Sequence, residues 1–74
     1  MQQITLTTDW TQITAIPALL QFFCSLEVLL SLGDAPDEIS FVCDNKQFYT
    51  NTSNMKIWAK VPFGKGRVVK YELV

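Results

Sequence analysis

The chain contains no histidine among its 74 residues. This absence removes the imidazole base that activates serine and cysteine nucleophiles, and with it the commonest metal ligand in proteins. The separation of Cys24 and Cys43 matches no metal-ligand spacing, and no histidine is present to complete a zinc site. We therefore expect no metal, no cofactor and no catalytic residue, and we predict that the protein is not an enzyme.

The two cysteines stand next to apolar residues, Cys24 after Phe23 and Cys43 after Val42. A free cysteine in such company commonly serves as a small buried hydrophobic residue, which is the interpretation we prefer. The N-terminus has no basic segment followed by an apolar core, so we expect no secretory signal. A disulfide is therefore not implied, and whether the two thiols are ever oxidised is left open.

The sequence also lacks a long uninterrupted apolar run. The longest apolar stretch covers residues 16–32 and is interrupted by Pro17, Gln21, Ser25, Glu27 and Ser31. These interruptions make it a poor membrane span. We predict a soluble protein with no membrane partner.

Basic residues are missing from the first 44 positions. The acids there are Asp9, Glu27, Asp34, Asp37, Glu38 and Asp44, and all of the lysines and the arginine follow. The net charge of −1 predicts no nucleic-acid binding. The two halves either pair within one fold, as oppositely charged neighbouring strands, or form two opposed faces that would suit head-to-tail packing of subunits. The sequence does not choose between these two arrangements.

Apolar residues make up 49% of the chain, which is high for its length. A domain of this size buries only about 60% of its unfolded surface, so some large apolar side chains must stay near the surface. Exposed apolar patches usually mark a partner surface. We therefore expect association with other copies or with a partner; the alternative is a tightly packed monomer with scattered surface hydrophobic residues.

Turn-forming residues break the sequence into short pieces rich in Ile, Val, Phe, Thr, Tyr and Trp. This spacing predicts one mostly β domain over residues 1–74, a small antiparallel β-sandwich or jelly-roll-like barrel of about six to seven short strands. The expected strands are 3–7, 19–24, 27–32, 39–43, 47–50, 55–61 and 67–73.

Two of these expectations concern the C-terminal part of the chain. The last two strands, joined through residues 62–66, are expected to form a hairpin. Lysines are expected on the outer faces of these strands. That assignment sets Lys70 outward and places Val69 and Tyr71 on the opposite face.

Residues 17–32 allow a second interpretation. Pro17 is suited to the first turn of a helix and Gly33 to its C-terminal stop, so an amphipathic helix in an α+β fold is the alternative. We prefer two strands around a turn near Cys24, because the preceding phenylalanines and Val28 favour strand.

Three local patterns suggest binding chemistry, and each has a plainer explanation. The acidic segment 34–38 lacks the alternating ligands of a calcium loop and is expected to be an exposed turn. The segment 63–67 lacks the phosphate-loop pattern and is expected to be a hairpin turn. In one interpretation, four aromatic residues form a platform for sugars or bases: Trp10, Tyr49, Trp58 and Phe63. In the other, which we prefer, the two tryptophans fill the core and their indole N–H groups are bonded at its edge.

Taken together, the segments 4–13, 33–36, 56–60 and 67–73 resemble a known class of proteins. They are similar to the small β-sandwich proteins of tailed-bacteriophage particles, which coat capsids or decorate tails and necks. The resemblance implies a virion structural protein that is made in the host cytoplasm. It also implies a homo-oligomer whose partners are copies of itself and phage capsid or tail proteins.

For that function we expect Trp58, Lys60 and Phe63 to lie near a partner contact. The alternative function is a module that binds glycans or a host protein through exposed aromatic residues. A small inhibitor of a host enzyme is a third hypothesis.

Overall fold

The computed structural model describes residues 2–36 and 38–73, and within them it contains β-strands and no helix. The eight strands are β1 (Gln2–Leu6), β2 (Thr11–Thr14), β3 (Ala18–Phe23), β4 (Glu27–Leu32), β5 (Phe41–Asp44), β6 (Phe48–Asn51), β7 (Ile57–Lys60) and β8 (Gly66–Glu72). The alternative helix over residues 17–32 is therefore wrong. Strands β3 and β4 occupy that segment, where the paired phenylalanines and Val28 favour an extended backbone.

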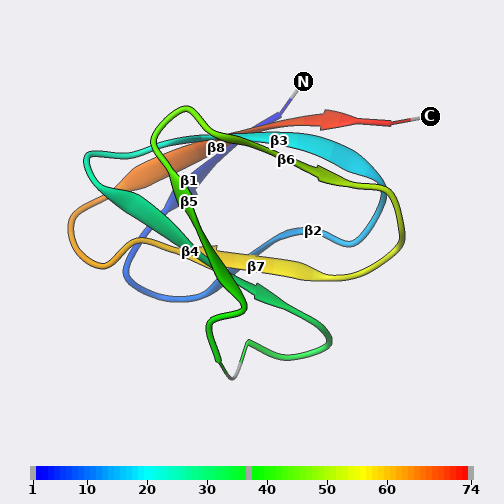
Figure 1. The fold of residues 1–74 in the computed structure, drawn as a ribbon, viewed down its shortest axis with the longest axis horizontal. Helices are drawn as coiled ribbons and strands as arrows, with labels where there is room; N and C mark the ends of the chain where they lie inside the picture. Colours follow the sequence, from blue (N-terminus) through cyan, green and yellow to red (C-terminus); the bar gives the residue numbers. More distant parts are fainter. Residues whose placement is uncertain (1, 37, 74) are drawn as a thin grey trace.

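The strands form two antiparallel sheets of four, packed face to face (Figure 1). The order in the first sheet is β1-β8-β3-β6, and the order in the second is β2-β7-β4-β5. Among the described residues, β4 and β5 are the only consecutive strands that pair with each other. This order, in which the chain crosses repeatedly between two sheets, is that of a jelly roll. The structure thus confirms the predicted antiparallel β-sandwich.

The connection between β7 and β8 corrects one expectation. These strands do not form a hairpin, because β7 pairs with β2 and β4 whereas β8 pairs with β1 and β3. The segment 61–65, in which Gly64 has a φ of 72°, crosses from one sheet to the other. It delivers Gly66 against the end of β3, where an added Cβ would lie 3.0 Å from the Phe23 carbonyl oxygen.

Strand β2 is the one strand that the sequence does not predict. It has only four residues, Thr-Gln-Ile-Thr, and its register against β7 shifts between Gln12 and Thr14. The shift sets both Ile13 and Thr14 in buried positions, so the strict alternation that identifies a strand is lost.

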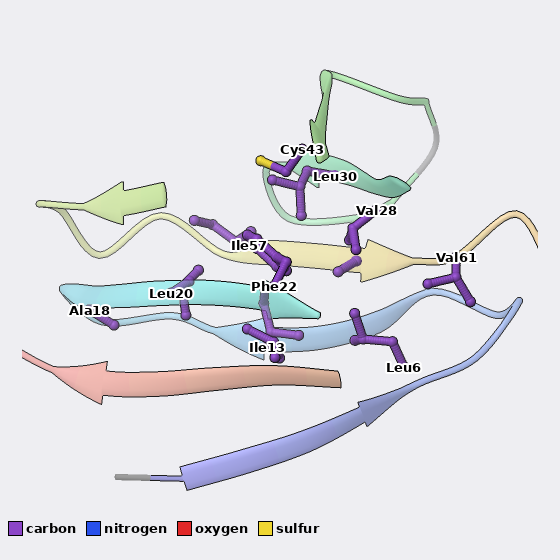
Figure 2. Close-up of a cluster of buried hydrophobic side chains, with 12 residues drawn as sticks. Leu6, Ile13, Ala18, Leu20, Phe22, Val28, Leu30, Cys43, Ile57 and Val61 are labelled. Carbon is purple, nitrogen blue, oxygen red and sulfur yellow. The ribbon is translucent and has the colours of Figure 1, made fainter. Parts of the chain in front are cut away.

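The core lies between the sheets and is built from alternate residues of nearly every strand (Figure 2). Its largest fully buried side chain is Phe22 of β3, with Leu20 from the same strand. The other residues of this cluster are Leu6, Ile13, Ala18, Val28, Leu30, Cys43, Ile57, Ala59, Val61 and Val68. Full burial of a Leu, Ile or Phe side chain contributes about 1.5–3 kcal/mol, so these alternating positions determine which face of each strand points inward.

Strand β8 faces the other way from the sequence-based expectation. Val68 is a core residue, so Lys70 shares its inward side while Val69 and Tyr71 lie on the outer face. The Lys70 side chain is only 11% exposed, and its ammonium lies 4.0 Å from the Glu72 carboxylate. The aliphatic part of a lysine side chain can be buried while its ammonium group reaches toward water. A lysine is therefore not a reliable sign of an outward-facing position.

The loops at one end of the sandwich are tied together by Asn51, the last residue of β6. Its side chain is buried, and its Nδ2 lies 3.1 Å from the Ile16 carbonyl oxygen, 3.0 Å from that of Ser53 and 3.3 Å from that of Met55. The amide therefore links the β2–β3 connection to the β6–β7 connection. A buried polar group satisfied in this way specifies a single loop arrangement.

Candidate functional site

The outer face of the first sheet carries an unusual number of apolar side chains. Because Leu20, Phe22 and Val68 point into the core, their neighbours along β3 and β8 point outward. We call the outward apolar residues of this sheet the apolar face: Leu19, Phe23, Phe48, Val69 and Tyr71. Phe48 is 54% exposed and Tyr71 is 40% exposed, so these two rings contact water, whereas Val69 faces outward but is only 6% exposed.

The strand register makes these residues neighbours. Leu19 pairs with Tyr71, and Gln21 lies between Val69 on β8 and Phe48 on β6. Directly opposite residues on one face have Cβ atoms about 4.5–5.5 Å apart. Of the five, only Leu19 and Tyr71 are directly opposite, and the others are diagonal neighbours around Gln21. The five side chains therefore gather on one face of β8, β3 and β6 around a single glutamine.

A single charged side chain stands on this outer face among the described residues. Arg67 pairs with Phe23, and its guanidinium carbon lies 4.4 Å from the centre of the Phe23 ring. Its Nη1 also donates a long hydrogen bond of 3.5 Å to Oε1 of Gln3. The remaining outward positions of the described strands in this sheet are Gln3, Thr5, Gln21 and Thr50. The face is thus apolar with a cation at one end.

The outer face of the second sheet has a different character. Glu27 of β4 pairs directly with Asp44 of β5, and Leu29 pairs with Val42 in the same pair of strands. Both carboxylates are exposed, and so is Val42, at 43%. We call these four residues the acidic corner. Like charges directly opposite each other on a sheet are unfavourable. Lys60 of β7 lies opposite Leu29 on the same face, but neither carboxylate is in an ion pair with the described residues.

Trp58, one of the predicted contact residues, lies on the outer face of β7 rather than in the core. Its indole Nε1 donates a 2.9 Å hydrogen bond to the carbonyl oxygen of Gly33, just beyond β4. The expectation that an indole N–H is bonded at the edge of the sandwich is confirmed for Trp58, but Trp58 does not fill the core.

Lys60 and Phe63 are the other predicted contact residues. Lys60 shares the outer face of β7 with Trp58, and its Nζ lies 4.6 Å from the centre of the Trp10 ring. Phe63 is 58% exposed and lies beyond the end of β7, in the connection to β8. The structure therefore places Trp58 and Lys60 on one face, with Phe63 at the adjoining end. Their role in a contact stays a prediction.

The four aromatic residues considered as a platform do not share a surface. Tyr49 packs against the core from the inner side of β6, and its ring centre lies 4.9 Å from that of Phe41. Trp58 and Phe63 lie outside the core, on the second sheet and in a loop. Tyr49 was therefore wrongly grouped with the exposed aromatic residues.

The charges of the two halves of the chain are mostly not paired within the fold. Two ion pairs join the described residues, Lys56 to Asp34 at 3.9 Å and Lys70 to Glu72 at 4.0 Å. Only the first links the acidic half to the basic half. Asp34 and Glu38 are exposed, as expected for an acidic turn, and Asp37 lies outside the described residues.

Both cysteines are free thiols, and Cys43 is buried in the core as the sequence predicts. Cys24 is partly buried and packs against the core from the segment after β3. Burial raises the pKa of both thiols above its ordinary value of 9.0, and the negative charge of nearby Asp44 adds to the effect. A raised pKa keeps both thiols protonated and poorly nucleophilic near neutral pH.

Within the part of the chain that the structure describes, there is no cavity suited to a small ligand and no cluster of three or more possible metal ligands. The same residues include no helix long and apolar enough to cross a membrane. The chain matches no known protein-family profile, no curated protein sequence and no solved structure.

The apolar face is not predicted from the sequence. The predicted contact residues include Trp58 and Phe63, and Val69 and Tyr71 are expected on the opposite side of β8 from the one they occupy. One signal for the correct arrangement is present in β3, where Gln21 lies between Leu20 and Phe22 and so identifies the outward positions as Leu19, Gln21 and Phe23. Only the pairing of β3 with β6 and β8, which are distant in sequence, shows that these residues continue into one patch.

Proposed function

We propose that this chain is a non-enzymatic structural protein of a tailed-bacteriophage particle, a capsid decoration or head or tail accessory protein that acts by assembly. The observation that carries this proposal is the apolar face, where Phe48 and Tyr71 expose aromatic surface beside Leu19 and Val69. Aromatic residues are enriched at protein–protein interfaces, and a contiguous exposed apolar patch of this kind usually marks a contact.

The fold agrees with this class without identifying it. Jelly-roll sandwiches form many viral capsid proteins, but they also occur in lectins and cupins. The repeated crossing between sheets leaves two broad sheet faces, which suits a subunit that is gripped on both sides. The assignment to a tailed-bacteriophage particle rests on the sequence resemblance.

Purified particles test the proposal directly. Tailed particles are banded by density from a lysate of the phage that encodes the chain, and their proteins are quantified by mass spectrometry. We expect the chain in the particle band at a constant copy number relative to the major capsid or tail protein. Its absence from intact particles, or a trace amount that varies between preparations, would overturn the proposal.

The predicted contact residues are tested in the same particles. Phe63→Ala is expected to lower the copy number of the chain on the particle, because Phe63 exposes its ring at the end of the sandwich. Met55→Ala, which removes a comparably exposed side chain at the opposite end, is the matched control.

A further inference from the structure

The cation of the apolar face and the acidic corner lie at the same end of the sandwich, on opposite faces. Arg67 pairs with Phe23, the last residue of β3, and Glu27 is the first residue of β4. Only residues 24–26 separate these two strand ends. Lys46 is exposed in the β5–β6 connection at this end, where its backbone N–H donates to the Phe22 carbonyl oxygen at 2.6 Å.

The two faces complement each other in charge and in apolar content. The apolar face offers Phe48 and Tyr71 with Arg67 at one end and, within the described strands, no outward carboxylate. The acidic corner offers the exposed Val42 with the carboxylates of Glu27 and Asp44, beside Lys60 on the neighbouring strand. Oppositely charged patches of this kind direct association and fix its register.

We propose that copies of this chain stack head to tail, with the apolar face of one copy on the acidic corner of the next. This inference rests on the proposed function of assembly and names its contact. A second copy displaced along the direction in which the two sheets stack brings its Arg67 and the Lys46 loop toward Glu27 and Asp44 of the first. The cations then offset the like-charge repulsion between the two carboxylates.

A two-fold contact through the apolar face alone does not have this advantage. It joins two identical faces, so it leaves Glu27 and Asp44 of both copies facing water with their repulsion intact. A head-to-tail contact uses two different surfaces and leaves one of each free on every dimer. It therefore continues into a ring or an open stack, according to the rotation between copies.

Two variants, each disabled on one surface, distinguish these arrangements. Phe48→Asp places a carboxylate on the apolar face, where it repels the acidic corner of the next copy. The combined variant Glu27→Gln/Val42→Gln/Asp44→Asn removes the charge and the apolar contact of the acidic corner. All four positions are exposed, and the pair of disabled surfaces gains no new ion pair.

Light scattering of the two variants, alone and mixed, tests the proposal. We expect each variant alone to have the 8.4 kDa mass of one chain, with self-association weakened more than tenfold. We expect the equimolar mixture to reach the mass of two chains and to grow no further, since only one pair of intact surfaces exists. Circular dichroism and urea unfolding confirm that both variants fold.

Other outcomes contradict the inference in distinguishable ways. If the combined variant self-associates like the unmodified chain while Phe48→Asp does not, the contact is two-fold and the head-to-tail arrangement is wrong. If the mixture stays at the mass of one chain, the arrangement is also wrong. Neither result changes whether the chain is found in purified particles. The particle measurement therefore tests the proposed function independently of the head-to-tail contact.

A charge exchange provides a second measurement at other positions. Arg67→Glu and Asp44→Arg are each expected to weaken self-association, and mixing them is expected to restore it. A mixture no stronger than either variant alone would count against Arg67 and Asp44 facing each other.

Discussion

Trp58 and Gly33 are joined by a hydrogen bond of 2.9 Å from the indole Nε1 to the carbonyl oxygen. The N–H of Gly33 in turn donates to the carbonyl oxygen of Lys56 at 2.9 Å. The N–H and the carbonyl group of Gly33, which has a φ of 124°, are thus both hydrogen-bonded, one to Lys56 just before β7 and the other to Trp58 within β7. Trp58 fixes the point where the chain leaves β4, in addition to any role in a contact.

Replacement of Trp58 by phenylalanine is therefore expected to lower stability. Trp58→Phe keeps an aromatic ring on β7 but removes the bond to Gly33, which should reduce the free energy of unfolding by about 1 kcal/mol. Trp10→Phe is the control, since its indole N–H has no hydrogen bond to the described residues and its ring can still contact Lys60. If urea unfolding gives equal values for both variants, the bond does not contribute to stability.

Asn51→Ala is expected to destabilise the chain by about 2 kcal/mol, because it leaves the carbonyl groups of Ile16 and Met55 without their common donor. Asn54→Ala removes the same amide from an exposed position and should change stability by less than about 0.5 kcal/mol. Urea unfolding followed by tryptophan fluorescence measures both. Equal effects would mean that the Asn51 side chain does not hold the loops.

Replacement of a core phenylalanine and of a surface phenylalanine should have very different effects on stability. Phe22 is fully buried, and Phe22→Ala should cost about 3–5 kcal/mol, enough to unfold much of so small a domain. Phe48→Ala on the apolar face should change monomer stability by less than about 0.5 kcal/mol while it weakens association. Thermal unfolding at low concentration makes the comparison. A large loss of stability for Phe48→Ala would show that its ring belongs to the core.

The thiols give a prediction about pH. Because burial and the charge of Asp44 raise the pKa of Cys43, the fold favours the neutral thiol. The resulting stabilisation is complete below pH 9.0, the ordinary value, and is lost as the pH rises through the higher value of the folded protein.

The free energy of unfolding of the unmodified chain should therefore fall more steeply above pH 9.0 than that of Cys43→Ala. In line with burial, a thiol reagent should label Cys43 far more slowly in the folded chain than in urea. Parallel pH curves for the two chains, or rapid labelling of Cys43 under native conditions, would contradict its placement in the core.

Much of the fold was predictable because burial has a local signature in the sequence. Alternation in β1 identifies Ile4 and Leu6 as inward, and the dense apolar segment divides into β3 and β4. The short, bulged β2 has no such signature, and neither does the crossing of the β7–β8 connection between sheets. Glycine-rich segments look alike whether they join paired strands or separate sheets.

The candidate site was less predictable, since its residues meet only through pairing between distant strands. Leu19 and Tyr71 are neighbours on the apolar face but are far apart in the chain. Lys70 gave a misleading signal, because its stem is buried on the inner side of β8. The opposition of Glu27 and Asp44 likewise follows from the register of β4 and β5 and from no local motif.

Light scattering across a concentration series tests most directly whether the chain assembles through the apolar face. We predict that the mass of the unmodified chain rises above 8.4 kDa with concentration, and that Phe48→Asp holds it at 8.4 kDa. Met55→Asp, a matched change at an exposed apolar residue outside this face, should associate normally. A constant mass of 8.4 kDa for the unmodified chain, or undiminished association of Phe48→Asp, would show that the chain does not assemble through the apolar face.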